Sequence, residues 1–237
     1  MKTVIIVSAD GEWSAVKALI PEAGTFEQSP WESFETKIEG REVTFVHGGW
    51  GKISAAANAQ FIIDRMRPDI IVNLGTCGGL QGRIVLGTVI LAERTAIYDI
   101  VEQMAEADSA AAFYSTELDL NWLPGLLPTP VVRALLVSAD RDILAADVPR
   151  LVSKYEAVAA DWESGAIAWV ANRSNQRLLI LRGVSDLVGG EGGEAYGDYE
   201  LFLRRTGEIM KRLLDALPKW LDAVEPAIQA SAVRNPS

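Results

Sequence analysis

The sequence predicts a single α/β domain in which helices cover a mostly parallel, twisted central sheet. Short apolar runs rich in β-branched residues alternate with helical patterns along most of the 237 residues, an order typical of parallel sheets. The runs at 3–7, 70–72 and 178–181 lack polar alternation, which indicates strands covered on both faces. Hydrophobic residues form 49% of the chain, enough for a substantial core in one domain.

Turn residues separate the predicted elements in the first half of the chain. Glu39-Gly40-Arg41 lies between two strand runs and predicts a hairpin, and Pro68 ends an Ala-rich helix. We expect a strand at 3–7, a helix at 11–20, strands at 33–38 and 43–47, a Gly-rich turn at 48–51, a helix at 52–66, and strands at 69–74 and 87–92.

The second half begins with a segment of weak pattern. Residues 100–130 are rich in small and acidic residues and contain three prolines, so we expect an irregular insertion or cover loop. Regular patterns return with an apolar run at 131–138, a helix at 149–155, a strand at 157–160, a helix at 163–172, a strand at 177–185, a Gly-rich loop at 189–193 and an amphipathic helix at 198–217. We assign residues 1–221 to the domain and 222–237 to a poorly patterned C-terminal tail.

Charge and cysteine content argue against several classes of protein. The formal net charge is −10 and no cluster of Lys and Arg interrupts it, so a nucleic acid would be repelled. The one cysteine, Cys77, has no partner for an internal disulfide, and the N-terminus lacks the features of a secretory signal. No apolar run approaches the ~20 residues of a membrane span. From the net charge, the single cysteine, the N-terminus and the short apolar runs together, we expect a cytoplasmic protein that binds neither nucleic acid nor membranes.

Three acidic residues each follow a predicted buried strand. Glu12 comes after the strand at 3–7, Glu163 after the short run at 157–160, and Asp186 directly after the strand at 177–185. Ligands of open parallel sheets bind outside the carboxyl ends of the strands, where residues from distant parts of the chain converge. We therefore expect these carboxylates to share one site.

Four short motifs carry a resemblance to a known family. They read Ser-Ala-Asp-Gly-Glu-Trp at 8–13, Gly-Thr-Cys-Gly-Gly at 75–79, Asp-Trp-Glu-Ser-Gly-Ala at 161–166 and Arg-Gly-Val-Ser-Asp at 182–186. In this order and spacing they resemble the nucleoside phosphorylase and nucleosidase superfamily, and within it the 5′-methylthioadenosine/S-adenosylhomocysteine nucleosidases. The resemblance extends to about Leu217 and implies a nucleoside phosphorylase-like fold.

The resemblance implies cleavage of the N-glycosidic bond of a purine nucleoside to free base and sugar. Such a bond breaks through a cationic sugar, and the purine leaves with a proton. The reaction therefore needs an acid that protonates the purine and a base that activates the water. By the resemblance, Asp186 protonates the base, which requires a raised pKa. Glu12 activates a water molecule that Arg182 and the Thr76 hydroxyl hold in place.

The same resemblance implies a set of substrate-binding residues. Glu163 matches the carboxylate that accepts hydrogen bonds from the ribose hydroxyls, and Gly78 and Gly79 let the backbone approach the ligand. Trp162 stands where the family often has methionine under the ribose, so it could narrow the pocket or stack on the ligand. The set is completed by Ser185, which precedes Asp186, and by Tyr199, which the resemblance puts beside the 5′ substituent and which could equally be a core residue.

Two departures from the family pattern concern the substrates. Arg141-Asp142-Ile143 stands where bacterial nucleosidases offer an aromatic that stacks on adenine, so the base remains open and includes a modified inosine type. Asp10-Gly11-Glu12 and Asn73-Leu74 stand where hexameric phosphorylases carry the cationic residues that bind phosphate. We therefore expect water as co-substrate, with a phosphate-dependent phosphorylase and a non-catalytic nucleoside-binding protein as the alternatives.

Several of these residues also have purely structural interpretations. Glu12 and Glu163 could be ordinary acidic residues at helix N-termini, Asp186 could be a turn residue, and Arg182 could form an ion pair only. Cys77 is expected to pack rather than react, because the chain has a single histidine to act as its base. We expect no organic cofactor and no metal. The resemblance implies a homodimer, with aromatic residues of the segment 100–130, Phe113 and Tyr114, as candidates to complete the partner's pocket.

Overall fold

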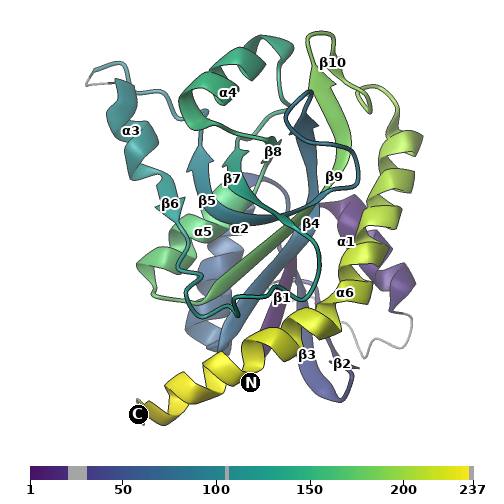
Figure 1. The fold of residues 1–237 in the computed structure, drawn as a ribbon, viewed down its shortest axis with the longest axis vertical. Coiled ribbons are helices and arrows are strands. Elements are labelled where there is room, and N and C mark those ends of the chain that lie inside the picture. The colour runs from purple at the N-terminus through teal and green to yellow at the C-terminus, as the bar shows by residue number, and fades with distance from the viewer. Residues whose placement is uncertain (21–30, 105–106, 235–237) are drawn as a thin grey trace.

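The computed structural model describes residues 1–20, 31–104 and 107–234 as one α/β domain (Figure 1). Its strands are β1 (Thr3–Val7), β2 (Ser33–Ile38), β3 (Arg41–His47), β4 (Ile70–Leu80), β5 (Val89–Ile97), β6 (Ser115–Glu117), β7 (Val132–Ser138), β8 (Ala159–Asp161), β9 (Leu178–Gly189) and β10 (Gly192–Gly193). Its helices are α1 (Asp10–Leu19), α2 (Gly51–Phe61), α3 (Ala107–Phe113), α4 (Val148–Tyr155), α5 (Ser164–Arg173) and α6 (Tyr199–Arg234), with the short helices η1 (Ile62–Met66) and η2 (Ala145–Asp147). The predicted single α/β domain is confirmed.

The sheet is mixed rather than mostly parallel. The described strand pairs comprise five parallel ones, β1–β3, β1–β4, β4–β9, β5–β7 and β7–β8. They also comprise five antiparallel ones, β2–β3, β4–β8, β5–β6, β5–β9 and β9–β10. Because β9 pairs with both β4 and β5, the strands β4, β9, β5, β7 and β8 close into a five-stranded ring.

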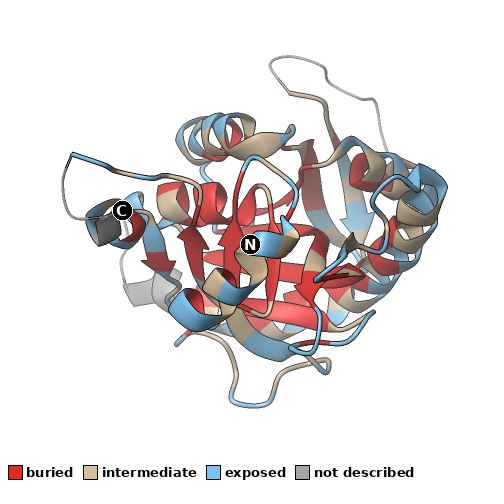
Figure 2. Ribbon diagram, turned by 90° about the horizontal axis from the view of Figure 1, so that it is seen from above, coloured by how far each residue is buried: buried red, intermediate tan, exposed pale blue. Residues whose placement is uncertain are grey.

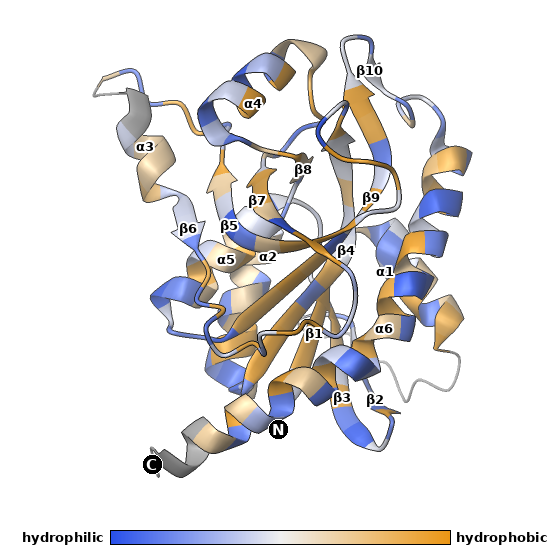
Figure 3. Cartoon of the chain, in the orientation of Figure 1, coloured by the Kyte–Doolittle hydropathy of each residue, from blue (hydrophilic) through white to orange (hydrophobic). Residues whose placement is uncertain are grey.

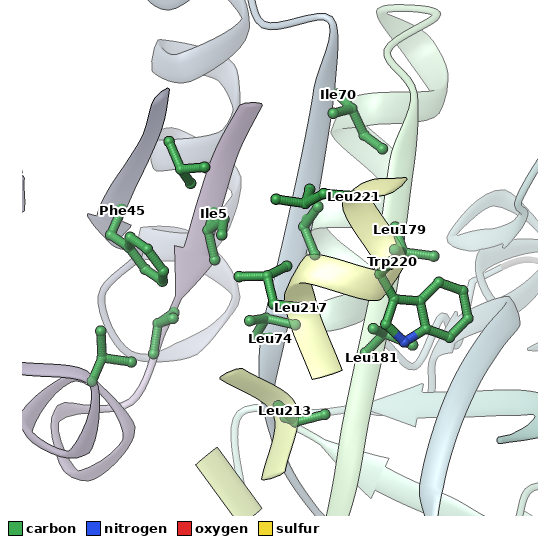
Figure 4. Packing of buried hydrophobic residues seen from close by; sticks show 14 of the residues in the cluster. Ile5, Phe45, Ile70, Leu74, Leu179, Leu181, Leu213, Leu217, Trp220 and Leu221 are labelled. Carbon is green, nitrogen blue, oxygen red and sulfur yellow. The ribbon is translucent and has the colours of Figure 1, made fainter. Parts of the chain in front are cut away.

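Helices cover both faces of the sheet and bury every residue of β1. Ile5 and Val7 point into a cluster with Trp13 of α1 and the apolar side of α6, whereas Val4 and Ile6 point into a cluster with α2 and α5. This alternation explains the uninterrupted apolar sequence of β1. The strands β1, β4 and β9 are largely apolar and buried (Figures 2 and 3). Figure 4 shows how α6 packs on the sheet through Leu213, Leu217, Trp220 and Leu221.

Three segments differ from the sequence prediction. The expected irregular segment 100–130 contains α3 and β6, with residues 105–106 outside the described part. The helix expected at 52–66 changes to a π-helix at Ile62, and Pro68 follows its end. The last helix continues 17 positions past the expected end at 217, to Arg234, and buries Val224 and Ile228 on the sheet. Of the expected tail 222–237, only residues 235–237 lie outside the described chain.

The long helix α6 bends beneath the sheet in Figure 1. Pro218 lies inside this helix, and a proline removes one backbone hydrogen bond, which is a usual cause of such a bend. Among the described residues, no helix has both the length and the apolar composition needed to cross a lipid bilayer.

Candidate active site

A pocket of about 440 Å³ opens where α1 and α5 begin beside the carboxyl ends of β4 and β9, a volume within the range of small-molecule sites. Seven of the ten predicted site residues line it, and they are Thr76, Gly78, Trp162, Glu163, Ser185, Asp186 and Tyr199. The other three, Glu12, Arg182 and Gly79, do not line it. The remaining lining residues are Ala9, Trp50, Cys77, Arg141, Asp142, Ile143, Ala160, Asp161, Ala195, Tyr196, Gly197 and Phe202.

Arg182 of β9 lies beneath the pocket and is 1% exposed. Its Nε lies 3.1 Å from Asp161 Oδ2, its Nη1 3.6 Å from Glu12 Oε1, and its Nη2 3.9 Å from Glu163 Oε2. One buried cation thus joins carboxylates from α1, from β8 and from the residue before α5. Buried charges are costly unless they are paired and hydrogen-bonded, so these four side chains form one electrostatic unit.

Glu12 links the first turn of α1 to strand β4. Its Oε2 accepts a hydrogen bond from the backbone N–H of Ala9 at 3.2 Å, which is the helix-terminus role that a structural interpretation assigns to it. Its Oε1 accepts two more, from the Thr76 N–H at 2.5 Å and the Thr76 hydroxyl at 2.8 Å. The side chain therefore caps its helix and also reaches a pocket-lining hydroxyl.

Glu163 stands at the N-terminus of α5 and is 4% exposed. Its Oε1 accepts a hydrogen bond from the backbone N–H of Gly51 at 3.1 Å. Burial raises the pKa of Glu163, and the nearby charges of Asp161 and Glu12 add to the rise while Arg182 opposes it. This carboxyl therefore tends to keep its proton, and hydrogen-bond donors from a bound ligand would favour the ionised form.

Sequence reasoning missed three residues that hold Arg182. Ser164 Oγ accepts a hydrogen bond from Arg182 Nε at 3.0 Å and donates one to Asp161. Asn73 Oδ1 accepts from Arg182 Nη2 at 2.9 Å, and its Nδ2 donates to the carbonyl of Ile6 at 3.1 Å. The sequence held two signals that these residues could hold Arg182. Asn73 is a polar residue among the apolar residues 70–74, and Asp161 and Ser164 flank the Trp162–Glu163 pair.

Asp186 lies on the wall of the pocket, close to the end of β9. The Ser185 hydroxyl donates a hydrogen bond to its Oδ1 at 3.0 Å. Burial raises the pKa of Asp186, and the charges of Glu194 and Asp142 add to the rise while the Ser185 hydrogen bond and Arg205 oppose it. A raised pKa is the condition that proton donation to a leaving base would impose on this residue.

Aromatic side chains form another part of the wall. The Trp162 ring stacks on Trp50 at a centroid distance of 5.0 Å, and the Tyr199 ring stacks on Phe202 at 6.0 Å. Trp50, Phe202 and the lining residue Tyr196 were not among the predicted site residues. Tyr199 is 66% exposed, so it is not a core residue.

The two adjacent glycines of β4 face opposite sides, as successive strand residues do. A Cβ on Gly78 would come 3.1 Å from Ile143 on the pocket side, which fits the predicted close approach of the backbone to a ligand. A Cβ on Gly79 would instead meet Ile84 and Val184 at 2.7 Å in the core. Packing, rather than a ligand, accounts for the glycine at position 79.

Cys77 lines the pocket but has no sign of nucleophilic activation. Burial raises its pKa well above the ordinary value, so the reactive thiolate is disfavoured. Among the described residues, no group of three or more His, Cys, Asp and Glu side chains is arranged to hold a metal ion.

The profile of the phosphorylase superfamily matches residues 2–219, nearly the whole chain. The chain belongs to the phosphorylase superfamily. The superfamily indicated by the four sequence motifs is thus confirmed, and with it a fold shared with nucleosidases of known structure.

Solved structures with this superfamily fold match over most of their lengths. The 5′-methylthioadenosine nucleosidase of Arabidopsis thaliana is 20% identical, with a TM-score of 0.76 over 94% of this chain and 96% of that one. The 5′-methylthioadenosine/S-adenosylhomocysteine nucleosidase of Colwellia psychrerythraea, in complex with adenine, is 20% identical, with a TM-score of 0.73 and the same coverage. The corresponding nucleosidase of S. pneumoniae, with a transition-state inhibitor, is 21% identical, with a TM-score of 0.71 over 94% of this chain and all of that one.

Proposed function

We propose that this chain hydrolyses the N-glycosidic bond of a purine nucleoside of the 5′-methylthioadenosine or S-adenosylhomocysteine type. The observation that carries the proposal is the contrast between two carboxyls: Glu12 is held by Arg182 and Thr76 below the pocket, whereas Asp186 lines it with a raised pKa. Two carboxyls in such different environments can divide base and acid roles. The names of the superfamily structures with the same fold support this substrate class.

The chemistry requires one proton donor and one acceptor. Asp186 protonates a ring nitrogen of the purine as the bond between base and sugar breaks, so the base leaves uncharged. Glu12 removes a proton from the water whose oxygen bonds to the sugar carbon. Thr76 lines the pocket and its hydroxyl donates a hydrogen bond to Glu12, which supports the role of Thr76 in holding that water.

Glu163 and Trp162 are proposed to bind the sugar. An ionised carboxylate only accepts hydrogen bonds, which suits two ribose hydroxyls. Ribose binding would draw Glu163 towards its ionised form, against the effect of burial. Trp162, Gly78, Ser185 and Tyr199 line the same pocket and complete the proposed substrate contacts.

Water is the proposed acceptor because the cations near the pocket are already paired. Arg182 is shared by three carboxylates, and Arg141, the one Arg or Lys among the described lining residues, lies 2.5 Å from Asp147. Phosphate binding would need a free charge-assisted donor. A phosphorylase therefore finds less support than a hydrolase.

Product analysis tests the proposed reaction. Purified protein is incubated with 5′-methylthioadenosine, S-adenosylhomocysteine, adenosine and inosine, with and without phosphate, and the products are separated by chromatography. We expect free base and free sugar in phosphate-free buffer. Formation of sugar 1-phosphate, with base released only when phosphate is present, would replace the hydrolase by a phosphorylase. Binding without release from any member of the panel would favour a nucleoside-binding protein.

We also propose that the protein is a cytoplasmic homodimer. A homodimer is supported by exposed apolar side chains near the pocket and on α2 and α3, among them Trp50, Ile53 and Phe113. Phe113 and Tyr114 pack against each other and against Trp169 of α5, away from this chain's own pocket lining. Light scattering after size-exclusion chromatography tests the dimer, and a monomer at micromolar concentration would contradict it. The cytoplasmic location and the domain boundary at residue 221 also stay predictions.

A further inference from the structure

The turn after β10 connects the Asp186 side of the pocket to two other parts of the molecule. The backbone N–H of Glu194 donates to the carbonyl of Leu187 at 3.0 Å, which fixes the turn on β9. The Tyr196 hydroxyl donates to the carbonyl of Ile143 at 3.0 Å, and both residues line the pocket. The turn therefore spans the pocket wall from β9 to the loop after β7.

Arg205 of α6 holds this turn and the strand end together. Its Nη1 donates to the carbonyl of Ser185 at 3.2 Å and to Glu194 Oε2 at 2.8 Å. The Arg205 side chain is 21% exposed and the Glu194 side chain 47% exposed, so the ion pair is only partly screened by water. One guanidinium thus contacts the carbonyl of the residue before Asp186 and the carboxylate of Glu194.

We infer that Arg205 is a positioning residue for Asp186, and that Arg205 and Glu194 act on the proton-donating carboxyl with opposite electrostatic effects. The inference rests on the proposed function for its catalytic meaning. Its physical content is geometric: Arg205 fixes the carbonyl of Ser185, the residue before Asp186, and forms an ion pair with Glu194. The positive charge of Arg205 favours an ionised Asp186.

The charges around Asp186 come from several elements. The charged groups that change the pKa of Asp186 are Arg205 on α6, Glu194 in the turn after β10 and Asp142 in the loop after β7. The charge of Asp186 in turn raises the pKa of two titratable neighbours, Tyr196 and Cys77. Arg205 lowers the pKa of Asp186, whereas Glu194 and Asp142 raise it. Removing the positive partner should therefore make Asp186 harder to ionise, and removing the negative one should make it easier.

Two variants that break the same ion pair separate this inference from a purely structural role. Activity that needs a protonated Asp186 falls as the pH rises through its pKa, so this limb of kcat/KM against pH reports the residue. In Arg205→Gln we expect the limb to move to higher pH by about 0.5 unit, and in Glu194→Gln to lower pH by a similar amount. If only the loss of the Arg205–Glu194 ion pair mattered, the limb would move in the same direction in both variants. Arg205→Lys keeps the charge and should restore the wild-type limb, and 1 M salt should shrink the shifts.

A measurement without turnover decides the inference independently of the proposed function. The protein is labelled with ¹³C at the Asp carboxyls, and the Asp186 signal is the one missing from Asp186→Asn. We expect its titration midpoint to rise in Arg205→Gln and to fall in Glu194→Gln. Midpoints that stay unchanged, or that move in the same direction in both variants, would overturn the inference. Opposite shifts in a protein that releases no base would sustain the coupling of Arg205 to Asp186 and refute the proposed function.

Discussion

Among single residues, Arg182 joins the candidate base Glu12 to two other buried carboxylates. Its guanidinium is buried, carries one positive charge and lies close to Asp161, Glu12 and Glu163. Removing one member of a buried charged group leaves uncompensated charge and typically costs about 3–5 kcal/mol. The positions of the acid-base residues and the stability of the fold are therefore linked through this residue.

The crowding around Arg182 is most severe at Gly75. A Cβ on Gly75 would come 2.1 Å from Arg182 Nη1 and within 2.8 Å of both carboxylate oxygens of Glu12. We predict that Gly75→Ala displaces the Arg182–Glu12 pair and lowers kcat/KM by at least about 100-fold, because the base is misplaced. Gly207→Ala is the matched control, since nothing lies within 4 Å of that Cβ and alanine favours the helix by up to ~1 kcal/mol. Equal activity of the two variants would remove the pair from the catalytic account.

Glu163 gives a prediction about pH and stability. A carboxyl whose folded-state pKa is raised stabilises the fold while protonated, and this contribution is lost as the pH rises from the ordinary value of 4.5 through the folded-state pKa. We expect the free energy of unfolding of the ligand-free protein to fall between about pH 5 and about pH 8, and to fall less steeply in Glu163→Gln. Urea unfolding at a series of pH values measures this, and parallel curves for the two proteins would contradict it. Glu163→Gln should nevertheless bind the nucleoside more weakly, because it loses a charged acceptor.

The residue types at the site were more predictable from sequence than their partners. Glu12, Thr76, Glu163 and Asp186 follow predicted strands, so their meeting could be anticipated from topology alone. Asn73 is 109 positions from Arg182 in the sequence, and Ser164 is 18 positions from it. The local sequence pattern carries no information on contacts between such distant residues. A two-glycine motif does not tell which of its residues faces the core, so the sequence could not distinguish Gly78 from Gly79.

At the scale of elements, α6 is the part that sequence reasoning shortened most. Pro218 and the loss of a simple amphipathic pattern suggested an end at 217, because proline interrupts helical hydrogen bonding. Packing overrides this: Trp220, Leu221 and Val224 are each at most 1% exposed. Propensity is a weak guide wherever tertiary burial compensates for a missing backbone bond.

Removal of residues 222–237 tests the contribution of this second half of α6. Val224 and Ile228 are buried on the sheet, and burying such a side chain contributes about 1.5–3 kcal/mol. We predict that the truncated protein loses at least about 3 kcal/mol of unfolding free energy in urea. The double variant Val224→Ala, Ile228→Ala should lose a similar amount without shortening the helix. Unchanged stability in both would show that the domain is complete at residue 221.

At the scale of the whole molecule, the closed ring of β4, β9, β5, β7 and β8 is what brings the candidate residues together. β4 supplies Thr76 and Gly78, β9 supplies Arg182 and Asp186, and β8 supplies Asp161. The hydrophobic pattern predicts strands but not the direction in which they pair, so the antiparallel contacts β5–β9 and β4–β8 could not be anticipated. The expected mostly parallel sheet was therefore wrong. The α/β class, the single domain and the convergence of the candidate residues do not depend on strand direction, because they follow from the order of strands and helices.

Turnover and nucleoside binding in Glu12→Gln and Asp186→Asn decide whether these two carboxyls divide the base and acid roles. Base release from the preferred nucleoside is followed in phosphate-free buffer, and ligand binding is measured by calorimetry on the same preparations. We predict that each variant loses at least about 100-fold in turnover while the nucleoside Kd stays within a few-fold of the wild-type value. Near wild-type turnover in either variant would contradict the division of acid and base roles between Asp186 and Glu12.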